Sequence, residues 1–309
     1  MTEASPDDAA PPATRCGFVA LIGAPNVGKS TLVNALVGSK VTIVSRKVQT
    51  TRALIRGIVV ENNAQIILVD TPGIFAPKRR LDRAMVSTAW SGAHDADLVC
   101  VLLDASEGLD AEAEAIFAKL ATVAHPKILV INKVDLVQRE KLLALAKTAN
   151  DRIVFEQTFM IAARSGDGVD DLRSTLARMV PPGPFHYPED QMSDAPIRHL
   201  AAEITREKIF QKLHQELPYS STVETESWAE KPDKSVRIEQ TIYVERESQR
   251  KIVLGKAGAT IKSIGSDARK EIAEIIEQPV HLFLFVKVRE NWGEDPDRYR
   301  EMGLEFPTE

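Results

Sequence analysis

The feature that most constrains this chain is a glycine-bounded loop between an apolar run and a helix-forming run. Residues 18–31 read FVALIGAPNVGKST, which contains the pattern G-x-x-x-x-G-K-[ST]. The glycines let the backbone turn tightly, and its N–H groups and the following helix N-terminus then face an anion. The lysine supplies charge for the outer phosphates, and the hydroxyl can ligate Mg²⁺. This pattern predicts a nucleotide triphosphate site formed by Gly23, Ala24, Pro25, Asn26, Val27, Gly28, Lys29, Ser30 and Thr31.

Strand-like and helix-like runs alternate between residues 16 and 180. The strand-like runs lie at 18–22, 53–60, 65–69, 97–103, 127–131 and 153–161, and the later helix-like runs at 81–93, 110–123, 139–149 and 169–179. Such alternation is typical of a mostly parallel sheet with helices on both faces. We therefore expect an α/β nucleotide-binding domain at residues 16–180, with its ligand at the carboxyl ends of the strands.

A D-x-x-G pattern, Asp70-Thr71-Pro72-Gly73, follows the strand-like run 65–69. In this pattern the aspartate reaches Mg²⁺ through water and the glycine N–H meets the γ-phosphate. The preceding segment, residues 39–56, is polar and basic, and we call it switch I. Its Thr50 and Thr51 both have hydroxyls that can ligate Mg²⁺.

An N-K-x-D pattern follows the strand-like run 127–131 and indicates the base. The carboxylate of Asp135 can accept two hydrogen bonds from guanine N1–H and the N2 amino group, and adenine would leave it unpaired. Asn132 suits bracing of the loop and base N7, and the stem of Lys133 suits packing on the base. All three motifs lie at the ends of strands, so the prediction is a GTP site.

In their order, GAPNVGKS, DTPG and NKVD resemble the motifs of a GTPase of the TrmE–Era class. The resemblance places the guanine O6 contact at Ala162 and Ala163, through the Ala163 N–H, although the family usually has serine at position 162. It also favours Thr51 as the Mg²⁺ ligand, because related sequences carry a threonine directly before an arginine. Asn26 corresponds to an asparagine that helps to bind K⁺ beside the phosphates. The alternative is that Asn26 only braces the loop.

Ile74 follows the D-x-x-G pattern where Ras-like enzymes carry a water-positioning glutamine. A hydrophobic side chain cannot orient the attacking water, and no arginine finger can be assigned from the sequence. We therefore expect slow intrinsic hydrolysis of GTP to GDP and phosphate. A K⁺ ion at Asn26 would stabilise the developing charge and stimulate the reaction.

A second, differently built region follows residues 181–196, which carry Pro181, Pro182, Pro184 and Pro188 and read as a stiff linker. A helix is expected at 197–217, strands at 221–228 and 236–244, helices at 248–254 and 259–277, and a strand at 280–289. This α-β-β-α-α-β order predicts a small α+β domain at residues 197–292.

A second glycine loop, Gly255-Lys256-Ala257-Gly258, separates the two later helices of this domain. Two glycines let the backbone approach a phosphodiester, and a basic patch that includes Arg250 and Lys262 surrounds them. The loop and the element order resemble a type II KH domain, which clamps single-stranded RNA. The alternative partner is a membrane surface or an anionic protein face, but the acidic half of helix 259–277 disfavours lipid.

A GTPase followed by a KH domain resembles the Era family. The stretches ELPYS at 216–220 and QPVHL at 278–282 and Trp292 agree with that family, and the resemblance covers residues 16–295. It implies binding to the 3′ end of 16S ribosomal RNA and a role in 16S rRNA maturation and 30S subunit assembly, with RNA affinity controlled by the GTP state. It also implies peripheral association with the inner membrane. The alternative function is a signalling GTPase switch that acts on a protein effector or at the membrane.

Composition and the chain ends set the remaining expectations. The net charge is −5, so RNA binding needs a local basic patch, and the two cysteines give no disulfide or zinc framework. No apolar run approaches ~20 residues, the length of a membrane-spanning helix. Residues 1–15 read as a disordered tail without a signal peptide, and residues 293–309 as a C-terminal tail. We expect a cytoplasmic monomer that uses Mg²⁺.

Overall fold

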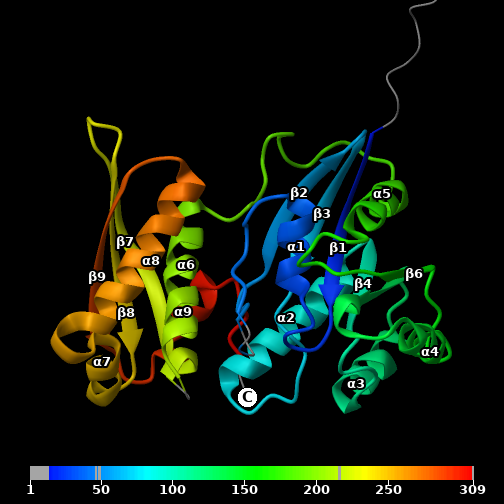
Figure 1. Ribbon diagram of the computed structural model, residues 1–309, viewed down its shortest axis with the longest axis horizontal. Coiled ribbons are helices and arrows are strands. Elements are labelled where there is room, and N and C mark those ends of the chain that lie inside the picture. Colours follow the sequence, from blue (N-terminus) through cyan, green and yellow to red (C-terminus); the bar gives the residue numbers. More distant parts are fainter. Residues whose placement is uncertain (1–13, 46, 48–49, 215–216, 308–309) are drawn as a thin grey trace, which may run out of the picture.

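The computed structural model describes residues 14–45, 47, 50–214 and 217–307. It has two lobes joined by an extended segment, with the first domain on the right of Figure 1 and the second on the left. The predicted disorder of residues 1–13 lies outside the described residues. Arg15, assigned above to the tail, is instead the first residue of a strand, because its backbone continues the ladder of the apolar residues after it.

The first domain is built on a six-stranded sheet with the order β2-β3-β1-β4-β5-β6. Only the β2–β3 pair is antiparallel among these strands, and it forms the expected hairpin, in which Asn62 has a φ of 53°. The mostly parallel sheet confirms the predicted α/β class. The strands are β1 Arg15–Ile22, β2 Ile55–Glu61, β3 Ala64–Asp70, β4 Leu98–Asp104, β5 Lys127–Asn132 and β6 Gln157–Met160.

Helices cover both faces of this sheet, and each face has its own apolar core. Helices α1 and α5 pack on one face through residues such as Leu32 and Leu172, and α2, α3 and α4 pack on the other through residues such as Trp90 and Phe117. Central strands are buried on both sides, as expected for a parallel sheet. The helices are α1 Lys29–Val37, α2 Arg80–Asp95, α3 Ala111–Leu120, α4 Arg139–Asn150 and α5 Val169–Met179, with a short 3₁₀ turn η1 at Val134–Leu136.

The second domain has the predicted α-β-β-α-α-β order. Its three-stranded sheet runs β7-β8-β9, with an antiparallel pair followed by a parallel pair, and α6, α7 and α8 pack on one face. The first helix ends at Lys212, earlier than the expected residue 217. The elements are α6 Ile197–Lys212, η2 Leu217–Ser220, β7 Ser221–Glu230, β8 Val236–Val244, α7 Glu247–Leu254, η3 Lys256–Gly258, α8 Ala259–Ile276 and β9 Val280–Val288.

The proline-rich segment 181–196 is extended, as expected, but it lies along the first domain. Backbone bridges join Pro182 to Arg15 and Ser193 to Gly57, and Arg56 pairs with Asp194 at 2.7 Å. The segment therefore lies along the first sheet and is not a free spacer.

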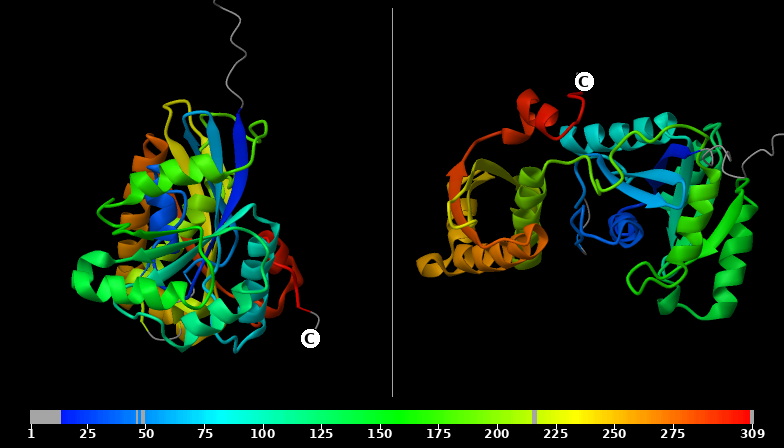
Figure 2. Two further views of the ribbon diagram at one scale, coloured as in Figure 1. Left: turned by 90° about the vertical axis from the view of Figure 1, so that its right-hand side faces the viewer. Right: turned by 90° about the horizontal axis from the view of Figure 1, so that it is seen from above.

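Residues 293–307, assigned above to a tail, instead form an ordered segment. It contains η4 Trp292–Glu294 and α9 Pro296–Glu301. Tyr299 and Leu304 are buried against Ala84 and Met85 of α2, and Figure 2 shows this red segment beside the cyan helix. The sequence did not indicate this packing because the apolar residues are few and belong to a helix of a single turn or two. The C-terminal segment thus returns to the first domain.

Switch I lies between the two domains, as the blue segment beside α6 in Figure 1. Ile43 packs into the apolar core of the second domain. The ammonium of Lys40 is 2.7 Å from Glu207 of α6 and also pairs with Glu271 of α8. The second domain is therefore docked directly on a segment that the sequence assigns to nucleotide sensing.

Candidate nucleotide site and nucleic-acid interface

The first glycine loop joins the end of β1 to the start of α1, as its motif predicts. Gly28 caps α1 with a φ of 102°, and a Cβ there would lie 2.2 Å from the Asn132 side chain. The Lys29 ammonium donates to the carbonyls of Gly23 and Ala24 at 3.0 and 2.9 Å. Burial lowers the pKa of Lys29 to about 8, although Asp70 acts in the opposite direction. The loop is a compact cradle with one buried cation at its centre.

Three hydroxyl groups converge on one carboxylate at the end of β3. Ser30 and Thr42 donate to Asp70 Oδ2 at 2.7 and 2.9 Å, and Thr51 lies 2.8 Å from Ser30 and 3.4 Å from the same carboxylate oxygen. Burial raises the pKa of Asp70. Its Oδ1 is buried and has no hydrogen-bond partner among the described residues. Hard oxygen groups of this kind fit Mg²⁺, so the cluster of Ser30, Thr51 and Asp70 could hold that ion.

The two threonines of switch I have different positions. Thr51 faces the Asp70 cluster, whereas the Thr50 hydroxyl donates to Lys47 O at 2.8 Å, within switch I. The local geometry therefore favours Thr51 for a role at the metal.

Residues of the D-x-x-G motif lie against the glycine loop. The Thr71 hydroxyl donates to Leu21 O at 2.6 Å, and Pro72 is buried. A Cβ on Gly73 would lie 2.8 Å from the backbone of Pro25, so glycine allows this close approach. Ile74 is 8 % exposed and packs in the core beside Trp90, so its side chain is not available to orient water.

The base-recognition residues form a braced rim at the end of β5. Asn132 donates to Val27 O at 2.9 Å and accepts from the Ala163 N–H at 3.0 Å. This second bond uses the N–H that the resemblance assigned to guanine O6. Asp135 is exposed in η1, and the neighbouring Ala162 N–H bonds Asp167 O at 3.0 Å.

A single cavity of about 980 Å³ unites these motifs. It is large enough for a ligand of nucleotide size. Its lining includes the glycine loop, switch I, the base motif and two residues of α6 from the second domain, Phe210 and Gln211. Asn26 also lines it and has a left-handed φ of 63°.

Two functional groups were missed by the sequence reasoning. Thr42 is fully buried, and its backbone is held by Asn34, which accepts from the Thr42 N–H at 3.1 Å. Asp104 at the end of β4 pairs with Lys133. Although burial alone would raise the pKa of Asp104, hydrogen bonds from Lys133 and Ser106 lower it. The position of Asp104 at a strand end was the available signal, whereas nothing in switch I distinguished Thr42.

The second glycine loop lies between α7 and α8, on the far side of the second domain from switch I (Figure 1). Gly255, Ala257 and Gly258 all have positive φ, of 71°, 50° and 76°. A Cβ on Gly255 would lie 2.1 Å from Thr260 Oγ1. Lys256 and Lys262 are exposed beside the loop, and Ile252 is 55 % exposed. Backbone, cations and an exposed apolar side chain are the groups with which such a loop can contact a single strand.

Arg250 is less available than the two lysines. Its guanidinium donates to Val286 O at 3.3 Å and pairs with Glu247 at 2.8 Å. This arginine therefore also fixes α7 to β9. In the part of the chain that is described, no helix combines the length and apolar character needed to span a membrane.

Comparison with known proteins agrees with this architecture. Residues 18–133 match a family model described as a 50S ribosome-binding GTPase, and residues 216–293 match a KH domain model. The chain is 86 % identical to GTPase Era of Bradyrhizobium diazoefficiens over 97 % of both chains, and 81 % identical to GTPase Era of Afipia carboxidovorans over the full length of both.

Two solved structures have the same two-domain fold. One is Era in complex with MgGDPNP and nucleotides 1506–1542 of 16S ribosomal RNA, with a TM-score of 0.88, 37 % identity and coverage of 94 % of this chain and 99 % of that one. The other is a point variant of Aquifex aeolicus Era bound to GDP·AlF4⁻, with a TM-score of 0.89 and the same identity and coverage. The predicted GTPase domain and KH domain are confirmed, and the chain belongs to the Era family of GTPases.

Proposed function

We propose that this GTPase binds the 3′ end of 16S ribosomal RNA and acts in 16S rRNA maturation and 30S subunit assembly, with the GTP state controlling its RNA affinity. The observation that carries the proposal is the ion pair between Lys40 and Glu271. Lys40 belongs to switch I, and Glu271 belongs to α8, the helix that begins after the second glycine loop. This pair directly joins switch I to the proposed RNA-binding helix, so a change in switch I that breaks the pair would reach that helix.

At the GTP site, the proposed roles follow the geometry. The loop from Gly23 to Thr31 holds the phosphates, with Lys29 as the cation. Ser30 and Thr51 ligate Mg²⁺, Asp70 acts through water, and Gly73 meets the γ-phosphate. Asp135 selects guanine, with Asn132, Lys133, Ala162 and Ala163 as the supporting residues. Mg²⁺ neutralises phosphate charge when it is bound.

We also propose that K⁺ stimulates hydrolysis at Asn26. The burial of Ile74 in the core supports this role, because an apolar side chain then occupies the sequence position of the water-positioning group. GTP hydrolysis is measured at equal ionic strength in K⁺ and in Na⁺, with wild-type protein and an Asn26→Ala variant. We expect faster hydrolysis in K⁺ only for the wild type, and equal rates in the two salts would contradict the role.

At the RNA site, the second glycine loop takes the RNA backbone, with Lys256, Lys262 and Arg250 around it. The double variant Lys256→Asp, Gly258→Asp adds negative charge to the loop without touching the GTP site. We expect loss of binding to an RNA of the 1506–1542 sequence with GTP hydrolysis retained. A variant that still binds this RNA would show that the second glycine loop does not take the RNA backbone.

The coupling is tested with the same RNA. Its affinity is measured by fluorescence anisotropy with GDP and with a non-hydrolysable GTP analogue, and a scrambled RNA of the same composition is the control. We expect the two nucleotide states to differ by about five-fold or more, the lower range of allosteric couplings. Equal affinities would show that the Lys40–Glu271 contact does not control RNA binding.

For location we propose the cytoplasm, as a monomer, with peripheral contact to the cytoplasmic face of the inner membrane. The solved structure of Era with 16S ribosomal RNA supports a place at the ribosome. Flotation of the purified protein with vesicles of inner-membrane lipid composition tests the membrane contact, and protein that stays at the bottom of the gradient would contradict it.

A further inference from the structure

Three consecutive residues of switch I, Thr50, Thr51 and Arg52, contact the second domain, the GTPase site and the second domain again, in that order. Thr51 points its hydroxyl at Ser30 and Asp70 in the GTPase site. The residue before it, Thr50, accepts a hydrogen bond from the second domain at its carbonyl, and the residue after it, Arg52, extends its side chain into the second domain. The backbone of Thr51 is therefore held on both sides by the second domain.

The contact before Thr51 is made by Arg206 of α6. One nitrogen of its guanidinium, Nη2, donates to Thr50 O, and a fork of two bonds to Glu203, at 2.7 and 2.5 Å, fixes the guanidinium. The guanidinium also lies 5.3 Å from the centre of the Phe210 ring. Arg206 is 1 % exposed, and the Glu203 fork and the Phe210 ring hold the rotamer that reaches switch I. Because its guanidinium is held in this way, Arg206 can fix the position of the Thr50 backbone.

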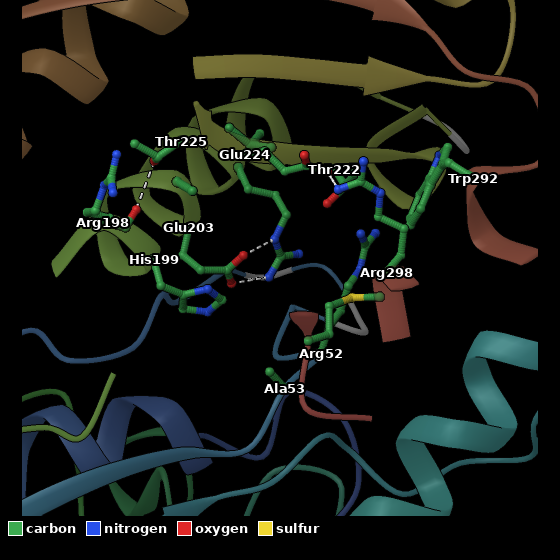
Figure 3. A pocket seen from close by; sticks show the side chains of 14 residues that line it. Arg52, Ala53, Arg198, His199, Glu203, Thr222, Glu224, Thr225, Trp292 and Arg298 are labelled. Atoms are coloured by element: carbon green, nitrogen blue, oxygen red, sulfur yellow. Dashed lines mark hydrogen bonds and ion pairs between the residues drawn. The ribbon is translucent and has the colours of Figure 1, made fainter. Parts of the chain in front are cut away.

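The contact after Thr51 is made by Arg52 itself. Its guanidinium donates to Ser221 O at 2.8 Å and to Tyr219 O at 3.1 Å, and it lies 5.6 Å from the centre of the Trp292 ring. Figure 3 shows Arg52 and Trp292 on one side of a cavity of about 300 Å³ and Glu203 on the other. The two arginines therefore attach switch I to two different elements of the second domain, α6 and the η2–β7 junction.

These two buried cations are unfavourable for stability taken alone. Burial, followed by repulsion from Arg206, lowers the pKa of Arg52 to about 9. Arg206 Nη1 is buried without a hydrogen-bond partner among the described residues. Groups that are costly to bury and rigidly fixed are typical of functional positions, since apolar residues would join two domains at lower cost.

We propose that Arg206 and Arg52 are positioning residues of the GTPase reaction, through which the second domain holds the Thr51 hydroxyl at the Mg²⁺ position. Phe210 and Gln211 of the same helix line the nucleotide cavity, so α6 forms part of the site wall. The second domain is then a component of the hydrolytic site as well as the receiver of its signal. Because coupling is reciprocal, a ligand that binds the second domain and changes the affinity for Mg²⁺·GTP through α6 has its own affinity changed by Mg²⁺·GTP by the same factor.

The decisive variant is Arg206→Met in the full-length chain, and the matched control is Lys212→Met. Both remove a cation from α6, but Lys212 pairs with Asp267 of α8, at 2.6 Å within the second domain. We measure kcat and KM for GTP, the Mg²⁺ concentration for half-maximal activity, the affinities for GDP and a non-hydrolysable GTP analogue, and Tm.

For Arg206→Met we expect about a tenfold fall in kcat and about a tenfold rise in the Mg²⁺ requirement, the lower end of the effect of losing an outer support of a metal ligand. The GTP-analogue affinity falls while the GDP affinity stays at the Lys212→Met value, because the switch threonine acts only with the γ-phosphate present. Values of kcat and Mg²⁺ requirement within about twofold of the control would overturn the proposal. Equal losses of GDP and analogue affinity would also overturn it, since they indicate general damage to the site.

Three further variants, namely Arg206→Lys, Arg52→Lys and their combination, keep the test decisive if Arg206→Met does not fold. Arg206→Lys retains the charge but not the fork, and we expect the same shifts in smaller measure. Wild-type values for Arg206→Lys would overturn the proposal. The double variant Arg52→Lys, Arg206→Lys is expected to be less impaired than the product of the two single effects, because both arginines act through Thr51. Fully multiplicative effects would show independent roles and contradict the proposal.

Discussion

The two glycine loops of this protein are built alike and placed in opposite surroundings. Gly28 and Gly258 are both left-handed residues that cap a helix N-terminus, with φ of 102° and 76°, and each loop contains a lysine. The first loop is enclosed, because Lys29 is 6 % exposed and a Cβ on Gly28 would meet Asn132. The second is open, because Lys256 is exposed and a Cβ on Gly258 would meet none of the described residues within 4 Å.

This difference shows how a glycine loop at a helix N-terminus can bind two kinds of ligand. An enclosed loop fits one small anion and fixes each of its atoms, so a single residue carries much of the binding. An open loop can track a flexible polymer, whose affinity is spread over many phosphate and base contacts. A glycine loop before a helix therefore has a different binding role at each of the two sites.

The largest expected effect is on the enclosed loop. Lys29→Ala should lower GTP affinity by about 30-fold or more, since losing one partner of a buried charged contact costs roughly 2–5 kcal/mol. Titration with a fluorescent GTP analogue measures it. Lys256→Ala is the matched change on the open loop and should lower RNA affinity only about three- to tenfold, as for an exposed phosphate contact. Losses of equal size at the two lysines would remove the distinction between the loops.

The two loops can also be compared by the effect of a glycine substitution in each on the free energy of unfolding. Gly28→Ala should lower the free energy of unfolding by about 2–3 kcal/mol, because the methyl group displaces Asn132 from its bonds to Val27 and Ala163. Gly258→Ala should cost only about 1–2 kcal/mol, the cost of a left-handed backbone for alanine. Urea unfolding of both variants checks this, and a larger loss for Gly258→Ala would show hidden packing at the open loop.

A smaller effect is expected on the number of protons that the protein takes up when it binds GTP. Burial lowers the pKa of Lys29 to about 8, so in the free protein this lysine is mostly neutral at pH 9 and charged at pH 7. A bound triphosphate favours the charged form, so GTP binding should take up close to one proton at pH 9 and almost none at pH 7, and the affinity should fall as pH rises above about 8. Calorimetry in buffers of different ionisation enthalpy measures the uptake. Lys256→Ala should leave it unchanged, and uptake that is equal at the two pH values would contradict the buried-cation description.

The smallest expected effect is a salt dependence at the open loop. Removing one phosphate contact with Lys256→Ala should reduce the slope of log affinity against log salt by about 0.7, the value for one contact to a single strand. RNA titrations at several salt concentrations give the slope. An unchanged slope would show that Lys256 does not touch a phosphate.

The sequence predicted most of the chemistry of the GTP site, because the P-loop, D-x-x-G and N-K-x-D motifs each carry their groups within a few residues. It did not predict Thr42 or the Asp104–Lys133 pair, because these depend on which segments the fold brings together. Arg52 stands in the segment that the sequence shows only as polar and basic, yet its side chain is 5 % exposed and is buried against the second domain. In general, short motifs whose groups lie within a few residues can be read from a sequence, whereas contacts between segments far apart in the chain cannot.

The C-terminal segment on α2 also changes what the second domain can do as a moving part. That domain is attached at two points, by residues 181–196 along the first sheet and by Tyr299 and Leu304 on α2. A body held at two points turns about the line between them and cannot diffuse freely on one tether. When its contacts with switch I open, it stays close at a high effective concentration, so closure is fast and needs no search. Nucleotide turnover would then rotate the second domain about the axis that joins these two attachments.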